Sequence, residues 1–266
     1  MRIVIMSDIH GNLLALDAVL ADAQAQGRID QYWVLGDLVD AGPAPVAVLE
    51  RLLQLPALQC IRGNTDRYVC SGAVNRFDQP GDAPDFNLEA AGSIAWTQGV
   101  VTYAGWLDWL TALPLEIRTT LPDGTTVLGV HAAPGCDTGL GFKVGLSNEE
   151  LLRVLGDCDA DLILGGHHHR PLDVTIDGKR IVNVGSVSLP FPPDLRASYV
   201  LLTADATGYT LEPRRVAYDR VAVLEEVQRL RHPGVGYIAS LLLGQRAPSG
   251  IEFMQRHLDA LPEVKR

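Results

Sequence analysis

The chain of 266 residues lacks several features that would assign it to a common class of protein. It holds no stretch of about 20 apolar residues, the length that a membrane span needs. Its N-terminus has only a short apolar run and no small-residue cleavage site, so we expect no signal peptide. The cysteines form no C-x-x-C pair, and we expect reduced core thiols in a cytoplasmic protein at Cys60, Cys70, Cys136 and Cys158.

Basic residues are also fewer than acidic ones. The 22 Lys and Arg residues are outnumbered by 32 Asp and Glu residues, which gives a formal net charge of −10. Avid binding of duplex DNA or RNA usually requires a basic patch, so we expect no such partner. A phosphorylated small-molecule substrate is not excluded, because bound divalent cations can reverse the local sign of the charge.

Short apolar runs alternate with helical patterns in the first part of the chain. Strands are expected at Ile3–Met6, Tyr32–Leu35 and Leu58–Ile61, and helices at 13–25 and 45–54. This alternation is typical of a parallel sheet with helices outside it.

The second half of the chain has an antiparallel pattern. Hairpins are expected within 115–130, 174–184 and 198–216, and Ser147 with Glu150 predicts a capping box that opens a helix. We therefore predict an α/β (α+β) fold, a four-layer-type sandwich of two mixed sheets flanked by helices.

The length suits one large domain, or one domain with an appendage. We predict a main domain at 1–218, within which the polar segment 66–101 is interpreted as an insertion or lid and 103–112 as an amphipathic helix. Residues 219–266 are expected to form a helical extension packed on the same domain. Its apolar run Ile238–Leu243 indicates either a helix packed at the sheet edge or a dimer face or lid, which leaves a homodimer open.

Polar residues follow five of the expected strands at the point where each strand ends. They are Asp8 and His10, Asp37, Asn64, His131, and the run His167, His168 and His169. The carboxyl ends of strands in α/β sheets converge on one rim. The set mixes hard oxygen with imidazole nitrogen and contains no thiolate, which favours Mn, Fe or Zn.

Each of these pieces alone has an ordinary explanation. Asp-x-His after a strand is usually a helix cap or a polar pair, Gly-Asp-x-x-Asp a turn, and a run of histidines a surface tract. All of them occur here in one order at strand ends, and chance explains that combination poorly. We therefore predict a metal site.

The order Asp-x-His, Gly-Asp-x-x-Asp, Gly-Asn-x-Asp, single His and Gly-His-x-His resembles the calcineurin-like metallophosphoesterase superfamily, and within it the small bacterial phosphodiesterase branch. The resemblance covers about residues 1–205 and includes Asn183-Val-Gly-Ser186 after a hairpin. The β-sandwich of that family, flanked by helices, agrees with the strands expected from the residues themselves.

The resemblance implies two divalent metal ions, Mn²⁺ first, with Fe, Zn or Ni as alternatives. One ion would take Asp8, His10 and His169, the second would take Asn64, His131 and His167, and Asp37 would bridge both. Two such ions roughly 3.5–4 Å apart can hold a bridging hydroxide that attacks phosphorus in line. The implied substrates are phosphodiesters, cyclic nucleotides among them, or phosphomonoesters.

Two other functions remain open: a protein or dinucleoside-polyphosphate phosphatase, and a non-catalytic scaffold of the same fold that binds a protein partner. A scaffold tends to lose metal ligands, and none of the seven is missing here.

Supporting roles are assigned to residues beside the ligands. Asp40 is expected either to orient a ligand histidine or to cap the following helix, and Asp66 either to orient Asn64 or a water or to cap a turn. Arg62 and Arg67 either contact phosphate or form surface ion pairs. His168 is expected to point away between two ligands.

One position departs from the family pattern. Many relatives have histidine after Gly-Asn, where it protonates the leaving oxygen, and this chain has Thr65. Threonine cannot donate a proton near neutral pH, and general acid catalysis is typically worth ~10²–10⁴-fold. We therefore expect good leaving groups, or another acid, or water, and the protein-serine-phosphatase alternative is disfavoured.

Overall fold

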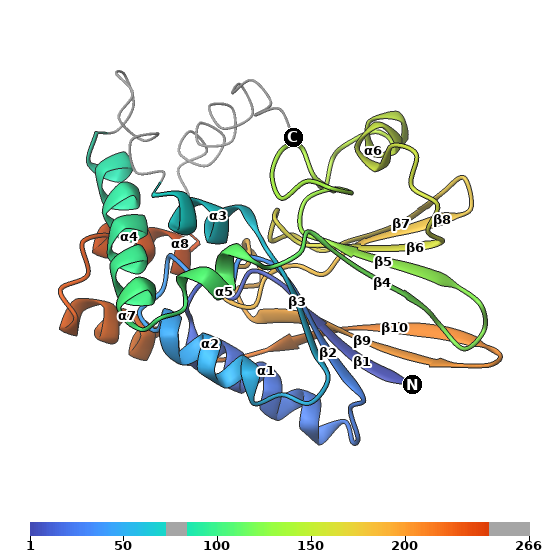
Figure 1. The fold of residues 1–266 in the computed structure, drawn as a ribbon, viewed down its shortest axis with the longest axis horizontal. Helices are drawn as coiled ribbons and strands as arrows, with labels where there is room; N and C mark the ends of the chain where they lie inside the picture. The colour runs from blue at the N-terminus through green and yellow to red at the C-terminus, as the bar shows by residue number, and fades with distance from the viewer. Residues whose placement is uncertain (73–83, 245–266) are drawn as a thin grey trace.

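In the computed structural model, residues 1–72 and 84–244 are described, and they contain two five-stranded sheets packed as a sandwich (Figure 1). The strands of the first sheet are β1 (Arg2–Met6), β2 (Gln31–Leu35), β3 (Leu58–Ile61), β9 (Ala197–Asp205) and β10 (Gly208–Val216). Those of the second are β4 (Glu116–Thr120), β5 (Thr126–Val130), β6 (Leu162–Gly165), β7 (Leu172–Ile176) and β8 (Lys179–Asn183). The predicted fold class is confirmed.

Both sheets are mixed. The strand orders are β10-β9-β1-β2-β3 and β4-β5-β6-β8-β7. In the first sheet β1, β2 and β3 are parallel, and in the second β5, β6 and β8 are parallel. The expected hairpins supply the antiparallel pairs β4–β5, β7–β8 and β9–β10. Residues that follow β1, β2 and β3 therefore share one edge, and so do those that follow β5 and β6.

The alternation of side chains along β1 explains why its sequence is apolar throughout. Ile3 and Ile5 lie in the core between the two sheets, whereas Val4 and Met6 lie in the core between the first sheet and its helices. A strand that is buried on both faces has no polar side to show in its sequence.

Helices cover both outer faces of the sandwich (Figure 1). The first sheet packs against α1 (Leu13–Ala25) and α2 (Pro45–Leu53), and the second against α6 (Asn148–Leu155). The predicted capping box of α6 is present: the Glu150 amide donates to Ser147 Oγ at 3.3 Å, and the Ser147 amide donates to Glu150 Oε2 at 2.8 Å.

The segment from 66 to 112 is more helical than expected. It contains α3 (Asn64–Ser71), α4 (Pro84–Tyr103) and α5 (Leu107–Thr111), while 73–83 lies outside the described residues. The helix α4 contacts α2, α3, α5 and α8 (Val235–Leu242). Its buried face includes the polar residues Asn87, Ser93 and Thr97, which obscures its apolar periodicity. The helix expected at 103–112 forms only over Leu107–Thr111, because Gly105, at φ +80°, ends α4 and separates it from α5.

The tail is helical as far as it is described, with α7 (Arg220–Arg229) followed by α8. Ile238, Leu241 and Leu242 are buried, and α8 contacts α4 and α7, so most of the apolar run suggested as a dimer face is used inside the molecule. Residues 245–266 lie outside the described part, and the proposed domain boundary at 218 stays a prediction.

Two smaller expectations have mixed outcomes. The described cysteines are all free, but only Cys60 is buried and Cys136 is exposed, so the expectation of core thiols is wrong for Cys136. Within the described residues, no helix combines the length and the apolar character that crossing a membrane requires.

The core between the sheets should contribute strongly to stability. Leu202→Ala removes a fully buried side chain from it and is expected to lower the free energy of unfolding by about 2–5 kcal/mol. Leu53→Ala, at a leucine that is 50% exposed, is the matched control and should change it by no more than about 0.5 kcal/mol. Urea unfolding followed by circular dichroism measures both, and equal losses would contradict this assignment of the core.

Candidate metal centre

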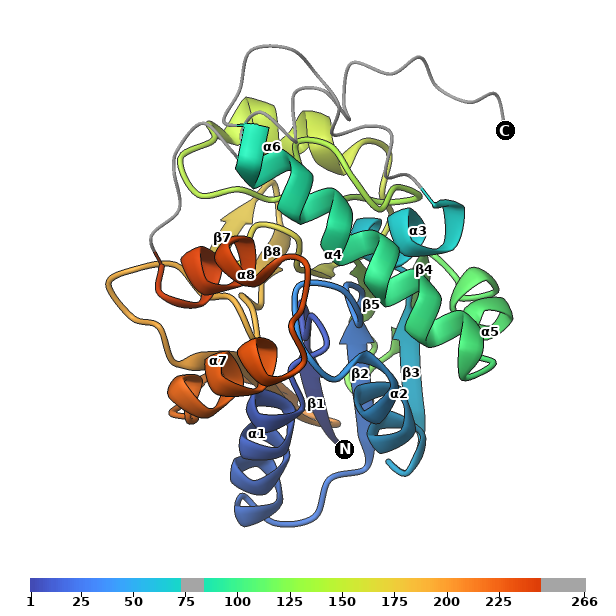
Figure 2. The ribbon, with the colours of Figure 1, turned by 90° about the vertical axis from the view of Figure 1, so that its left-hand side faces the viewer.

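The structure brings all seven predicted ligands together where the ends of the two sheets meet. They occupy the loops after β1, β2, β3, β5 and β6, as expected, and Figure 2 shows α3, α4 and α8 on this side of the strands. His167 is half-buried and the other six are buried: Asp8, His10, Asp37, Asn64, His131 and His169.

One group of donor atoms surrounds Asp8. His169 Nε2 lies 3.1 Å from Asp8 Oδ1 and 3.2 Å from His10 Nε2. Donor atoms of Asp8, His10, Asp37 and His169 all lie within 4.8 Å of one another. Among the described residues Asp8 Oδ1 is buried and, although His169 Nε2 lies 3.1 Å away, it receives no hydrogen bond of good geometry, which is costly without a cation. Buried carboxylate oxygen and imidazole nitrogen in this arrangement fit a divalent metal ion.

A second group surrounds Asn64. Its Oδ1 atom lies 2.8 Å from His167 Nδ1 and 3.1 Å from His131 Nε2. Asp37 lies between the two groups, with Oδ2 3.7 Å from His10 Nε2 and 3.4 Å from His131 Nε2. The ligand sets implied by the family resemblance therefore correspond to two neighbouring clusters that share one carboxylate.

The second nitrogen of three histidines is fixed by a backbone carbonyl. His131 Nδ1 contacts Leu35 O at 2.7 Å, His169 Nδ1 contacts Leu189 O at 2.9 Å, and His167 Nε2 contacts Gly139 O at 3.1 Å. An N–H that donates to a carbonyl leaves the other nitrogen with its lone pair facing the cluster. This is the usual way in which proteins orient histidine ligands to a metal.

The backbone at these positions is unusual, and no sequence pattern indicated it. Asp8, His10, Asp37, His167 and His169 all have φ between 50° and 71°. Few residues other than glycine adopt this left-handed region, which costs about 1–3 kcal/mol each and is concentrated at functional sites. Sharp turns of this kind point the ligand side chains of Asp-x-His and His-x-His toward one centre.

Glycine is needed where ligand turns touch each other. A Cβ atom on Gly63 would lie 2.1 Å from Asp37 Oδ1, and one on Gly166 would lie 2.0 Å from Ser7 Oγ. The glycines of the Gly-Asn and Gly-His motifs therefore provide the space that the ligands of neighbouring strands occupy.

The buried carboxylates and imidazoles of the cluster shift one another's pKa values. Burial raises the pKa of Asp37, but His131 and His10 outweigh it and hold that pKa below its usual range. Burial lowers the pKa of His131, but Asp37 outweighs it and raises that pKa instead. Burial also lowers the pKa of His10, to about 4, so His10 is neutral and able to ligate at physiological pH.

Asp66 joins two ligand turns through backbone amides. Its carboxylate accepts from the amides of Leu38 at 2.9 Å and Val39 at 3.1 Å, in the loop after β2, and from Gly63 at 2.9 Å, in the loop after β3. The bond from Gly63 caps the turn that opens α3, which is one of the two roles expected of Asp66. Burial, followed by repulsion from Asp37, raises the pKa of Asp66 to about 7.

Asp40 does not adopt either of its two expected roles. Its Oδ1 atom accepts from Ser93 Oγ on α4 at 2.6 Å, and burial raises its pKa to about 6. The following helix α2 begins after Ala44 without a side-chain cap, and no hydrogen bond to a ligand histidine occurs among the described contacts of Asp40. Asp40 instead links the loop of Asp37 to α4.

Thr65 is committed to local structure. Its hydroxyl donates to Val39 O at 3.1 Å, and its amide donates to Asp37 Oδ1 at 2.9 Å. His168 points away from the ligands, as predicted, and its Nε2 contacts Leu140 O at 2.6 Å. Neither side chain faces the cluster as a proton donor.

Arg62 and Arg67 both pair with Asp137, which sequence reasoning missed. Arg62 Nε lies 3.2 Å from Asp137 Oδ2, and Arg67 Nε lies 2.9 Å from both carboxylate oxygens. Of the two expectations, the ion pair is therefore the one observed. A single acidic residue in a Gly-rich loop carries no pattern that could have identified it.

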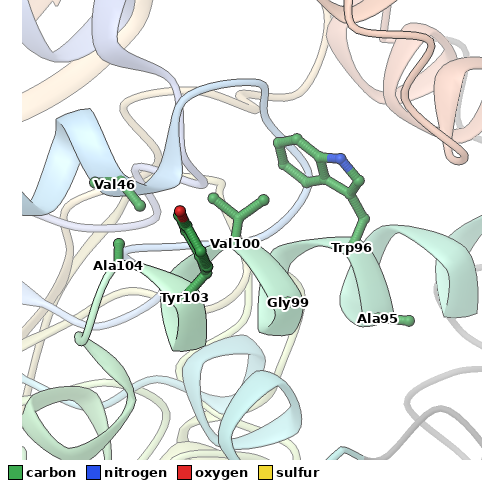
Figure 3. A pocket seen from close by; sticks show the side chains of 7 residues that line it. All are labelled: Val46, Ala95, Trp96, Gly99, Val100, Tyr103 and Ala104. Carbon is green, nitrogen blue, oxygen red and sulfur yellow. The ribbon is translucent and has the colours of Figure 1, made fainter.

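An apolar hollow between α2 and α4 is a separate feature. Its volume is about 580 Å³ (Figure 3). Its lining among the described residues contains no carboxylate or imidazole: Val46, Ala95, Trp96, Gly99, Val100, Tyr103 and Ala104. It offers no metal ligand.

The two-sheet sandwich and its cluster of potential metal ligands are of the phosphoesterase type, and comparison with known families agrees. Residues 1–207 match the calcineurin-like phosphoesterase superfamily domain. The chain belongs to this superfamily, and the family prediction made from its motifs is confirmed.

The relatives that match most of the chain are named for their family or not characterised. An uncharacterized protein of Methanocaldococcus jannaschii is 29% identical over 246 residues, which cover 87% of this chain and 93% of that protein. A metallophosphoesterase from Sphaerobacter thermophilus is 29% identical, with a TM-score of 0.68, and the alignment covers 90% of this chain and 98% of that one. A hypothetical protein from Pyrococcus horikoshii OT3 has a TM-score of 0.77 at 19% identity, and the alignment covers 92% of this chain and 99% of that one. At this identity the similarity supports the fold alone.

A local match adds one named activity. The symmetrical bis(5'-nucleosyl)-tetraphosphatase of Yersinia pestis is 39% identical over 70 residues, which cover 26% of this chain and 24% of that protein.

The close approach at Gly63 can be tested by mutation. In Gly63→Ala the new methyl group must displace Asp37, and we expect affinity for Mn²⁺ to fall by about 10–100-fold, the range for lost support of a ligand. Gly99→Ala, in α4, where the added methyl group would enter open space, is the control and should bind as the wild type does. Isothermal titration measures both, and unchanged binding by Gly63→Ala would show that the contact does not position Asp37.

Proposed function

We propose that this protein is a hydrolase of phosphoric esters that uses two divalent metal ions. The observation that carries the proposal is Asp37, whose Oδ2 atom faces a histidine of each donor cluster at 3.7 Å and 3.4 Å. Membership of the calcineurin-like phosphoesterase superfamily supports the same reaction class.

The residues divide between two metal positions. One ion would be held by Asp8, His10 and His169, the other by Asn64, His131 and His167, and Asp37 would contact both. When bound, such ions supply Lewis acidity and a hydroxide nucleophile at neutral pH. No side chain of the site then needs to act as nucleophile.

The chain itself fixes how Asp37 is presented. Because Asp37 Oδ1 accepts the Thr65 amide at 2.9 Å, Oδ2 is the atom left to face both clusters. Asn64 contributes a neutral oxygen, which limits the negative charge of the ligand set and keeps the site electrophilic. Asp66 holds the turns of both residues through backbone amides.

The substrate class follows from the missing proton donor. The Thr65 hydroxyl donates a hydrogen bond to Val39 O, so no side chain at this position protonates a leaving oxygen. Substrates whose leaving groups are stable as anions suit such a site best. Aryl phosphodiesters and activated phosphomonoesters are of this kind, whereas the ribose alkoxide that a nucleotide phosphodiester releases would need a proton from water.

Dinucleoside polyphosphates are a second candidate substrate. Cleavage of a phosphoanhydride releases a nucleotide phosphate, which departs without protonation, and the local similarity to the Yersinia pestis tetraphosphatase supports this class. A non-catalytic scaffold is less well supported, because every ligand is present and faces a cluster.

Metal dependence is the first test. Purified protein treated with a chelator should lose hydrolysis of bis-p-nitrophenyl phosphate, and Mn²⁺ should restore it, because the ions supply the nucleophile. The release of p-nitrophenolate measures the rate, and Mg²⁺, Zn²⁺, Fe²⁺ and Ni²⁺ are compared in parallel. Activity that persists undiminished in metal-free buffer would refute the mechanism.

Removal of the shared carboxylate is the second test. Asp37→Asn keeps the size of the side chain and removes its charge, and turnover should fall by at least ~10²-fold because both metal positions weaken. Asp161→Asn, at an exposed loop residue that bonds to Thr126, is the control and should retain activity. A near wild-type rate for Asp37→Asn would exclude Asp37 as the shared ligand.

A further inference from the structure

The three carbonyls that orient ligand histidines differ in how they are themselves held. Leu35 is the last residue of β2, and Leu189 lies in a buried segment pinned by the Leu189 amide to Ser186 Oγ at 2.8 Å. Gly139, which contacts His167, lies instead in the loop between β5 and α6, at φ +94°. The orientation of His167 therefore depends on a partly exposed loop, whereas that of His169 depends on a buried one.

That loop is fixed on one side by an ion-pair cluster. Asp137, two residues before Gly139, is 5% exposed and receives Arg62 Nε at 3.2 Å and Arg67 Nη2 at 2.9 Å. Burial lowers the pKa of Arg67, but the hydrogen bond to Asp137 outweighs it and raises that pKa, so the guanidinium stays charged. The two arginines flank Asn64 in sequence, and Asn64 is the residue that His167 contacts.

The other side of the loop is fixed by Asn183, whose Nδ2 atom donates to Phe142 O at 3.1 Å. Between these two anchors the loop lies directly on the histidines. A Cβ atom on Gly141 would lie 3.0 Å from the ring of His168 and 3.2 Å from that of His167. A shift of the loop at Asp137 would therefore move the support of His167.

We propose that Asp137 is a positioning residue for one of the two metal positions. By binding Arg62 and Arg67 it holds the Gly139 carbonyl against His167 Nε2, which keeps His167 Nδ1 directed at Asn64 Oδ1. The inference rests on the proposed function, because it assigns Asp137 to the position formed by Asn64, His131 and His167. The other position should not depend on Asp137, because its His169 is oriented by the Leu189 carbonyl, in a different segment of the chain.

The decisive measurement is Mn²⁺ binding to the full chain, by equilibrium dialysis and electron paramagnetic resonance. Wild type should bind two ions with a spin-coupled spectrum. Asp137→Ala should keep one ion at wild-type affinity and bind the other at least about tenfold more weakly, the lower bound for lost support of a ligand. At intermediate Mn²⁺ it should show the spectrum of an isolated ion, and excess Mn²⁺ should restore turnover.

Two further variants separate positioning from general damage. Arg67→Ala leaves Asp137 paired with Arg62 and should weaken the same metal position by a smaller factor. Asp173→Ala removes an ion pair with Arg180, at 2.7 Å in the β7–β8 hairpin, and should bind both ions as wild type does. Thermal unfolding of each variant shows whether it is folded under the binding conditions.

Each outcome has a separate meaning. If wild type binds two ions and Asp137→Ala binds both unchanged, or loses both equally, the positioning role is wrong while the proposed function stands. If Asp137→Ala does not fold, Arg67→Ala decides, and unchanged binding of both ions overturns the role. If wild type binds a single ion, the two-metal function fails.

Discussion

The structure depends on one buried carboxylate between imidazoles from different sheets. Asp37 follows β2 of the first sheet, and its Oδ2 atom lies 3.4 Å from His131, which follows β5 of the second. The packing of Ile5 and Leu35 against Leu164 sets how closely these strand ends approach. The packing of the core between the sheets therefore determines the spacing of the donor atoms. A shift of one sheet against the other by one residue would separate the two clusters.

Bringing so many donors to one point has a conformational cost, and the surrounding backbone offsets it. The left-handed turns at Asp8 and Asp37 are held by hydrogen bonds that do not involve the ligand atoms themselves. The Asp8 amide donates to Gly36 O at 3.0 Å, and Asp8 O accepts from Ser186 Oγ at 3.0 Å. Asp66 serves the Asp37 loop in the same way. Because these supports are already satisfied, the donor atoms are preorganised for a cation and need not fold around it.

Sequence reasoning located the strands and the candidate ligands because both are local. An apolar run such as that before Asp37 specifies a buried strand, and the residue at its end is carried to the rim by topology alone. The role of Asp137 arises from contacts with Arg62 and Arg67, 70 or more residues away in sequence, and no local pattern encodes them. The helix α4 was underestimated for a different reason: polar residues occupy three of its buried positions, at Asn87, Ser93 and Thr97, which obscures the apolar periodicity by which an amphipathic helix is recognised.

The absence of an acid at Thr65 follows from what this residue does in the fold. Its amide fixes Asp37 Oδ1 and its hydroxyl bonds to the Asp37 loop at Val39, so the side chain braces the shared carboxylate. A histidine here would have to abandon the second contact to reach a leaving group. Thr65 thus supports Asp37 at a position where the family pattern has a proton donor. Hydrolysis without that donor suits only leaving groups that depart as stable anions. Phosphoanhydrides and aryl diesters meet this condition, whereas ribose-linked diesters and alkyl phosphomonoesters such as phosphoserine do not.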